Sequence, residues 1–248
     1  MSVAIGGDVD YACARVAARE GARADAAAWA RIETARELRV MLDVARSAGA
    51  LSPLHDWTTG IAAEQDPHEI ERALRGHWRE AGAEAVRWMP QRWQPAVAWA
   101  VTLELLPWVD ALRRRTPMPP GFGDEDERAQ MERTLATLPP AADGAGVLHA
   151  WRDELARRLP ASHAREAPLL PAWLRVLAAH DRAMREAPPG DASLLVASLR
   201  ARLRALRRRA MLEPTAVFVY VTQRALDLAR FRGEIMRRKL LPHVTATA

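Results

Sequence analysis

The sequence of 248 residues contains one cysteine, one lysine and no asparagine. The single cysteine, Cys13, excludes an intramolecular disulfide and any Cys-x-x-Cys metal or redox site. β-Branched and aromatic residues are also scarce, whereas alanine, leucine, arginine and glutamate dominate, and this composition favours helices over strands. We therefore expect an all-α protein, a multi-helix bundle, in which residues 1–248 form a single helical domain.

A long hydrophobic run is missing as well. The longest apolar stretch, residues 96–109, is interrupted by Glu104 and Pro107 and is shorter than the roughly 20 residues of a membrane-spanning helix. Residues 1–10 have neither the charged start nor the apolar run of a signal peptide. We expect a cytoplasmic protein that does not itself cross a membrane.

The glycine motifs of nucleotide-binding and hydrolytic enzymes are absent. The sequence has no Walker loop, no G-x-G-x-x-G and no G-x-S-x-G, so it lacks the usual phosphate cradle, dinucleotide fingerprint and hydrolase nucleophile turn. The seven histidines lack metal-ligand spacing, since the residue four after His68 is Arg72 instead of the second histidine of a zinc-protease helix. We predict no enzymatic activity, no cofactor and no metal site.

One enzymatic alternative remains at the acidic run of residues 124–127. A magnesium site like that of all-α terpenoid synthases needs carboxylates at i and i+4 on one helical face and a second cluster on an opposing helix. Here the acids are consecutive and stand where a helix is predicted to begin, so they meet its positive dipole end. We favour this helix start over a diphosphate-processing enzyme.

Positive charge is present in excess but is nearly all arginine. The formal net charge is +5, and every basic residue except Lys239 is an arginine. This bias, together with the missing asparagine, is typical of a GC-rich genome, and the acidic residues interleave with the arginines, so most of them indicate an ordinary solvated surface. Nucleic acid is therefore an unlikely partner.

The arginine-rich segment of residues 200–209 is the exception that we keep as an alternative. Leucines recur on one face of its predicted helix, and between them stand Arg200, Arg202, Arg204, Arg207, Arg208 and Arg209. The leucine face indicates a core or partner contact, and the arginines are expected to surround it. The alternative function is a nucleic-acid-binding or regulatory protein that uses this helix.

Local signals place several helices and one break. Asp66-Pro67-His68-Glu69, with an N-cap aspartate, proline at the first helical position and glutamate at the third, is the clearest helix start. Thr34 with Glu37 predicts a capping box ahead of a helix with one apolar face; the members of that face are Leu38, Met41, Leu42 and Ala45. The tryptophan-rich region that follows is predicted to be the central core; its members are Trp78, Trp88, Trp93, Trp99 and Trp108. Proline and glycine at residues 116–123 mark a candidate subdomain boundary.

Three segments together resemble the C subunit of archaeal and bacterial V/A-type ATPases, called subunit d in the eukaryotic enzyme. The first is Tyr11-Ala12-Cys13-Ala14-Arg15 with Arg19 and Arg23 after it, and the second is Ile70-Glu71-Arg72-Ala73-Leu74-Arg75. The third contains Pro214, Tyr220 and Asp227-Leu228-Ala229-Arg230-Phe231-Arg232, followed by Arg238 or Lys239. The family's asparagine is missing from this third segment, Ala225 stands at its upstream acidic position, and residues 85–190 are not matched.

The resemblance implies an all-helical, funnel-shaped coupling subunit without active-site chemistry. Such a subunit links the central stalk to the membrane rotor ring of a rotary motor, takes part in proton or other ion transport, and lies at the inner face of the membrane through its partners alone. Its partners are the stalk and ring subunits. We expect the C-terminal charged residues to contact the stalk; they are Asp227, Arg230, Arg232, Arg237 and Arg238.

Overall fold

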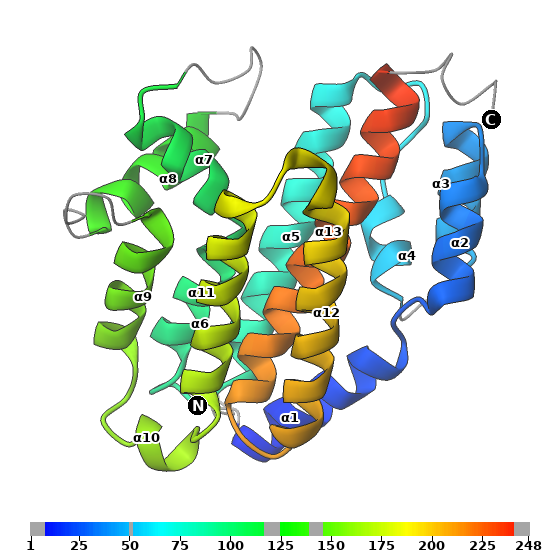
Figure 1. Cartoon of the computed structure of the whole chain (residues 1–248). Helices are drawn as coiled ribbons and strands as arrows, with labels where there is room; N and C mark the ends of the chain where they lie inside the picture. The colour runs from blue at the N-terminus through cyan, green and yellow to red at the C-terminus, as the bar shows by residue number, and fades with distance from the viewer. Residues whose placement is uncertain (1–7, 50–51, 117–124, 139–145, 241–248) are drawn as a thin grey trace, which may run out of the picture. The chain divides into compact units, whose positions relative to one another are not determined.

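The computed structural model describes residues 8–49, 52–116, 125–138 and 146–240. Within these ranges the chain forms α-helices and short 3-10 helices and no strand, so the predicted all-α fold is confirmed (Figure 1). The helices, in chain order, are α1 (Val9–Gly21), α2 (Ala26–Thr34), α3 (Leu38–Arg46), α4 (Pro53–Thr58), α5 (Pro67–Trp88), α6 (Gln94–Val101), η1 (Thr102–Leu105), α7 (Leu106–Arg113), α8 (Glu125–Thr137), α9 (Val147–Arg158), α10 (His163–Glu166), α11 (Leu170–Glu186), η2 (Pro189–Asp191), α12 (Ala192–Arg209) and α13 (Thr215–Leu240).

The chain divides into two compact units. The first unit contains Met1–Val16 and Gly82–Gln223, and the second contains Ala17–Ala81 and Arg224–Ala248. The divisions fall inside α1, α5 and α13. Most of the candidate boundary at residues 116–123 lies outside the described residues, so that boundary and the single-domain assignment stay predictions.

Aromatic side chains form the core of the first unit. The Phe218 ring lies 5.2 Å from that of Trp173 and 6.1 Å from that of Trp93, measured between centroids, and all three side chains are fully buried. Each buried indole N–H needs an acceptor, and Trp173 Nε1 donates to Thr222 Oγ1 at 3.0 Å. The predicted tryptophan core is confirmed in part: Trp88, Trp93 and Trp99 are buried in this unit, Trp108 is only half-buried, and Trp78 is buried in the second unit.

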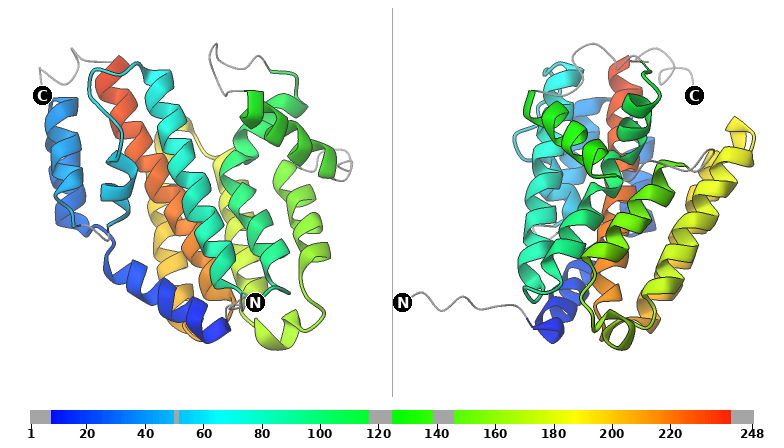
Figure 2. Two further views of the ribbon diagram at one scale, coloured as in Figure 1. Left: turned by 180° about the vertical axis from the view of Figure 1, so that it is seen from behind. Right: turned by 90° about the vertical axis from the view of Figure 1, so that its left-hand side faces the viewer.

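The α11 and α12 helices lie side by side in the first unit, as both views in Figure 2 show. Buried leucines of α12 recur at Leu199, Leu203 and Leu206, which is the spacing of one helical face. The predicted leucine face is therefore confirmed as part of the core, and the opposite face of α12 meets solvent.

The second unit has its own core, built around the end of α13. Its α2, α3 and α4 helices are contributed by the N-terminal part of the chain, and Trp57 of α4 lies 6.0 Å from Phe231 of α13 between ring centroids. Ile70 and Leu74 of α5 are fully buried in this unit. The single apolar face predicted for α3 is buried as well.

Two predicted helix starts had different outcomes. At the start of α5, Asp66 Oδ1 accepts from the His68 and Glu69 amides, so the N-cap aspartate is confirmed, and Glu69 Oε2 accepts from the Asp66 amide and completes a capping box. The box at Thr34 and Glu37 is wrong. Thr34 ends α2 and donates its hydroxyl to the Ala30 carbonyl, while Glu37 precedes α3 without a side-chain capping bond.

One stretch, Gln94–Arg113, is long and apolar enough to cross a membrane by length and composition alone. It covers α6, η1 and α7 and extends beyond residues 96–109 at both ends, so the expectation that no stretch is long enough is wrong by this measure. One such stretch is weak evidence for a membrane span, because core helices of soluble proteins pass the same test. Four residues of α6 are buried and none of η1 is, and a third of the apolar window is buried.

Candidate functional site

The charged residues of α13 that were predicted to meet a partner all lie in the second unit, where each has partners within the chain. Asp227 is buried, and its Oδ2 accepts from Arg23 Nη2 at 2.7 Å and from Arg23 Nε at 2.9 Å. Burial alone would lower the pKa of Arg23, but the charges of Asp227 and Glu20 outweigh it and raise that pKa. This pair connects α13 with the residues that follow α1.

Arg230 and Arg232 hold two further helices to α13. The Arg230 guanidinium pairs with the Glu33 carboxylate, with 2.7 Å from Nε to Oε1, and lies 4.3 Å from the centre of the Trp29 ring. Arg232 pairs with Glu71 of α5 at 2.9 Å, and Arg75 pairs with the same carboxylate at 3.1 Å. Arg230 therefore joins α13 to α2, and Arg232 joins it to α5.

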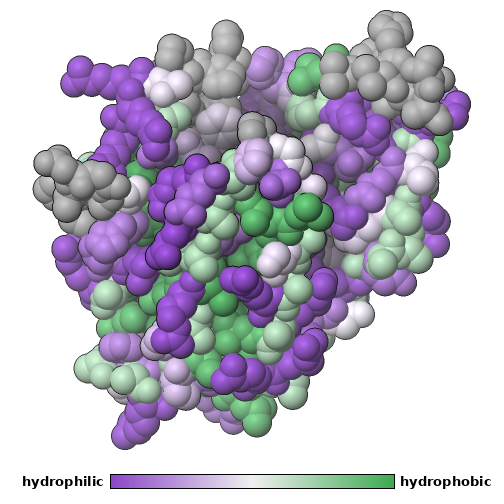
Figure 3. Space-filling model, in the orientation of Figure 1, coloured by the Kyte–Doolittle hydropathy of each residue, from purple (hydrophilic) through white to green (hydrophobic). Residues whose placement is uncertain are grey.

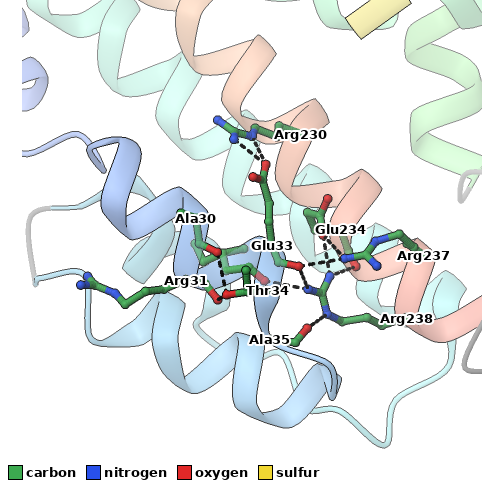
Figure 4. A network of polar contacts seen from close by, with 10 residues as sticks. Ala30, Arg31, Glu33, Thr34, Ala35, Arg230, Glu234, Arg237 and Arg238 are labelled. Atoms are coloured by element: carbon green, nitrogen blue, oxygen red, sulfur yellow. Dashed lines mark hydrogen bonds and ion pairs between the residues drawn. The ribbon is translucent and has the colours of Figure 1, made fainter. Parts of the chain in front are cut away.

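Arg238 completes the set by binding the end of α2 (Figure 4). Its Nη2 donates to the Ile32 carbonyl at 2.7 Å and to the Glu33 carbonyl at 3.1 Å, and its Nε donates to the Ala35 carbonyl at 2.8 Å. The last carbonyls of a helix lack partners within it and carry the negative end of its dipole. A buried guanidinium satisfies both needs here.

Glu234 balances this charge one turn earlier. Its Oε2 accepts from Arg238 Nη1 at 2.6 Å and from Arg237 Nη2 at 2.8 Å, and Arg237 also reaches the Glu33 carbonyl at 3.1 Å. Burial would raise the pKa of Glu234, but the bonds and charges of the two arginines lower it. We call the contacts of Arg230, Arg237 and Arg238 with α2 and Glu234 the α2 clamp.

The α2 clamp is suited to holding helices together and offers no group for chemistry. Its guanidiniums are occupied by carboxylates and carbonyls of the same unit, and Arg238 and Asp227 are 5% and 4% exposed. A contact between these residues and a partner protein stays a prediction. The sequence does not identify Glu33 as a partner, because it lies about 200 positions before the arginines of α13. The spacing of Glu234 and Arg238 at i and i+4 indicates one contact of the α2 clamp from the sequence alone.

A second group of arginines, on α12 in the first unit, is arranged differently. Arg202, Arg204, Arg208 and Arg209 are exposed, and none of them forms a hydrogen bond or ion pair with any residue in the described ranges. Arg200 and Arg207 are half-buried. Figure 3 shows hydrophilic side chains projecting from the surface that α11 and α12 form, with apolar surface visible between them.

No group of three or more histidine, cysteine or acidic side chains that could hold a metal ion occurs among the residues with described positions. His68 stands in the first turn of α5, where its amide donates to Asp66. The α8 helix begins at Glu125, but Asp124 and the side chains of residues 125–127 lie outside the description. The magnesium alternative therefore has no geometry to support it.

Comparison with known proteins gives no match. No family model, curated protein or solved structure matches the chain. The fold class and the contacts within each unit are therefore the basis for a functional proposal.

Proposed function

We propose that this chain is a non-catalytic coupling subunit of a V/A-type rotary ATPase that links the central stalk to the membrane rotor ring. It binds proteins, carries no cofactor, and associates with the cytoplasmic face of the membrane through its partners. The all-α fold and the three segments that resemble the family's motifs support this proposal.

The observation that carries the proposal is that residues from all three segments interact. Arg23 of the first segment pairs with Asp227 of the third, and Glu71 of the second pairs with Arg232 of the third. Scattered helical motifs have little specificity when considered singly. A resemblance is more informative when its residues touch, because interacting residues depend on one another for their stability.

A coupling role requires stiffness, and the contacts that α13 makes in the second unit favour it. Torque is transmitted well only by elements that do not bend or separate under load. The Arg23–Asp227, Arg232–Glu71 and Arg238–α2 contacts join three separate parts of the N-terminal region to one helix. Charged hydrogen bonds, such as those of Arg23 and Arg238, are stronger than neutral ones.

Affinity purification from membranes tests the proposal. The tagged full-length chain is expressed in its own cells, membranes are solubilised in mild detergent, and co-purifying proteins are identified by mass spectrometry. We expect the stalk and ring subunits to be recovered together with the chain. Recovery of the chain alone, from cells that contain an assembled rotary ATPase, contradicts the proposal. A neighbouring reading frame for a Walker-containing ATPase subunit is the quickest supporting observation.

The second candidate function is nucleic-acid binding or regulation by α12. The specific observation in its favour is that four arginines of this helix are exposed and form no hydrogen bond or ion pair within the described part of the chain, although the charge of Glu213 acts on one of them, Arg209. Binding to phosphates by these side chains would weaken steeply with added salt. Salt-insensitive or absent binding to DNA and RNA removes this candidate.

A further inference from the structure

We infer that the solvent face of α12 is a docking surface for an acidic helical segment of a partner protein. The inference deepens the proposed coupling role by naming the chemistry of one partner, and it rests on that role only for the partner's identity. The contacts and charges of α12 itself carry the argument.

The composition of this face is the first step. Buried positions recur at Leu199, Leu203, Leu206 and Ala210, so the opposite face points to solvent. Leu194, 69% exposed, is the one large apolar side chain exposed on α12. The other exposed residues of the helix are alanines, serines and arginines, and the helix contains no acidic residue. The arginines therefore have no carboxylate on their own helix to pair with. The exposed residues are Ser193, Leu194, Ala197, Ser198, Ala201, Arg202, Arg204, Ala205, Arg208 and Arg209.

Arginine also pairs readily with carboxylates across an interface. Its planar guanidinium binds both oxygens of a carboxylate, and it loses less hydration on burial than an ammonium group does. Arginine is enriched at the energetically dominant positions of protein interfaces. Elsewhere in this chain, buried arginines such as Arg23 and Arg238 do bind carboxylates. Arg204 and Arg208 of α12 have the same capacity, and no described residue of the first unit forms a hydrogen bond or ion pair with them.

The dimensions of the charged surface favour one helix as its occupant. At about 1.5 Å per residue, Arg202 to Arg209 cover roughly 10 Å of helix axis, which is about two turns of a partner helix. Arg204 and Arg208 are four residues apart and so face carboxylates placed at i and i+4. The alanines between the arginines allow a partner backbone to approach closely.

Nearby carboxylates interrupt the positive charge beside α12. Burial lowers the pKa of His180 in α11, on which the charges of Asp181 and Arg202 also act, and the carboxylate of Glu213 interacts with Arg209. Arg185 of α11 is paired with Asp181 at 2.6 Å, while Arg175 and Arg182 of the same helix are exposed. Nucleic acid needs cations along two phosphate backbones or a long groove, so this mixture of charges favours a smaller partner.

The end of the helix supplies an apolar contact beside the charges. Leu212 is 83% exposed and Met211 is 56% exposed, in the turn that follows Arg209. An exposed leucine next to a row of arginines matches a partner helix that carries a few apolar side chains beyond its acidic ones. A membrane surface would call for a larger continuous apolar face than these two residues and Leu194, near the start of α12, provide.

A peptide-binding experiment with the full-length chain tests the inference. The probe is a synthetic helix of about 20 residues, long enough to fold, with glutamates at i, i+4 and i+7 on an alanine background. A glutamine version, a short DNA duplex and vesicles containing phosphatidylserine are the competitors. Fluorescence anisotropy is measured at low ionic strength and at about 0.15 M salt.

The decisive comparison uses two double variants with the same change in charge. The test variant is Arg204→Glu with Arg208→Glu, and the matched control is Arg128→Glu with Arg133→Glu, at exposed positions of α8 in the same unit. We expect the test variant to weaken binding of the glutamate helix at least about tenfold, which equals about 1.4 kcal/mol. The control variant should change it less than about twofold.

Four outcomes overturn the inference: equal loss in both variants, no binding of the glutamate helix at low salt, tighter binding of the DNA duplex, or tighter binding of the vesicles. Membrane co-purification separates this inference from the proposed function. If stalk and ring subunits are recovered with the Arg204→Glu/Arg208→Glu variant as well as with the unaltered chain, the α12 surface is wrong and the coupling role stands. If the glutamate helix binds α12 and no ATPase subunit is recovered, the α12 surface stands and the coupling role is wrong.

Discussion

Arginine is used in two ways on two helices of this chain. On α13, in the second unit, Arg230, Arg232 and Arg238 are occupied by carboxylates and carbonyls that the N-terminal region supplies. On α12, in the first unit, Arg204 and Arg208 point to solvent and have no such partner among the described residues. The difference teaches that a run of arginines in a sequence has no fixed meaning. Whether it is structural or available depends on which remote acids and helix ends reach it.

The largest effect is expected from Arg238→Ala in the α2 clamp. The change removes the side-chain donor of the Ile32 and Ala35 carbonyls and one of the two arginines that bind the half-buried Glu234 carboxylate, so we expect the free energy of unfolding to fall by about 3 kcal/mol. Chemical denaturation monitored by tryptophan fluorescence measures it. Arg237→Ala is the matched control, since its side chain is 39% exposed and we expect a loss below about 1 kcal/mol. Equal losses in the two variants would show that the α2 clamp does not depend on Arg238.

Arg238 also illustrates which parts of the fold the sequence predicts. The N-cap at Asp66 and the buried face of α3 depend on residues within a few positions, and both were predicted correctly. The box at Thr34 and Glu37 has an equally clear pattern but did not form: Thr34 is the last residue of α2, and the carbonyls on either side of it bind Arg238. A local pattern does not show that a helix end is bound by a residue about 200 positions later.

The candidate site was predictable only in part, for the same reason. The sequence predicts that the arginines of α13 form charged contacts. Their partners Glu33 and Glu71 were not, because a pairing between remote helices depends on tertiary packing. The exposed arginines of α12 followed more directly from periodicity, since the leucine spacing fixes which face meets solvent.

The second prediction concerns the pH dependence that Glu234 gives to the second unit. Its pKa is lowered in the folded protein, so its contribution to stability is present above the unfolded pKa of about 4.3 and is lost as the pH falls through the lower folded value. We expect Glu234→Gln to be less stable than the unaltered chain at pH 7 and nearly as stable at pH 3. Denaturant midpoints across this range measure the difference. A constant difference would contradict the assigned pKa direction.

Glu213 in the first unit should show the opposite sign. Burial raises its pKa, which outweighs the bond from the Leu169 amide and the charge of Arg209. A raised pKa stabilises the folded state fully below the unfolded value, and this stabilisation is lost as the pH rises through the folded pKa. We expect Glu213→Gln to raise stability at pH 7 by less than about 1 kcal/mol, since the group is partly solvated. A loss of stability at pH 7, measured by the same denaturant midpoints, would show that its bond to the Leu169 amide dominates.

Two glycines of α5, one in each unit, differ in how closely other side chains pack against them. A methyl group added at Gly82 in the first unit would lie 2.5 Å from a Val101 methyl, whereas one at Gly76 in the second unit would meet nothing within 4 Å. Glycine inside a helix costs roughly 0.5–1 kcal/mol relative to alanine. We therefore expect Gly76→Ala to stabilise the protein by about that amount and Gly82→Ala to destabilise it by about 1 kcal/mol. Thermal melts of both variants measure the contrast, and stabilisation by Gly82→Ala would mean that Val101 moves aside freely.

The smallest change in stability is expected at Arg204 and Arg208, whose replacement should have the largest effect on binding of the glutamate helix. Arg204→Ala with Arg208→Ala removes no contact among the described residues of the first unit, and alanine is the best helix former, so the free energy of unfolding should change by less than about 0.5 kcal/mol. The denaturation experiment that resolves Arg238→Ala measures this change too. A loss above about 1 kcal/mol would mean that these arginines support the fold, as those of α13 do, and are not free for a partner. An unchanged stability together with lost binding of the glutamate helix would separate the two uses of arginine within one protein.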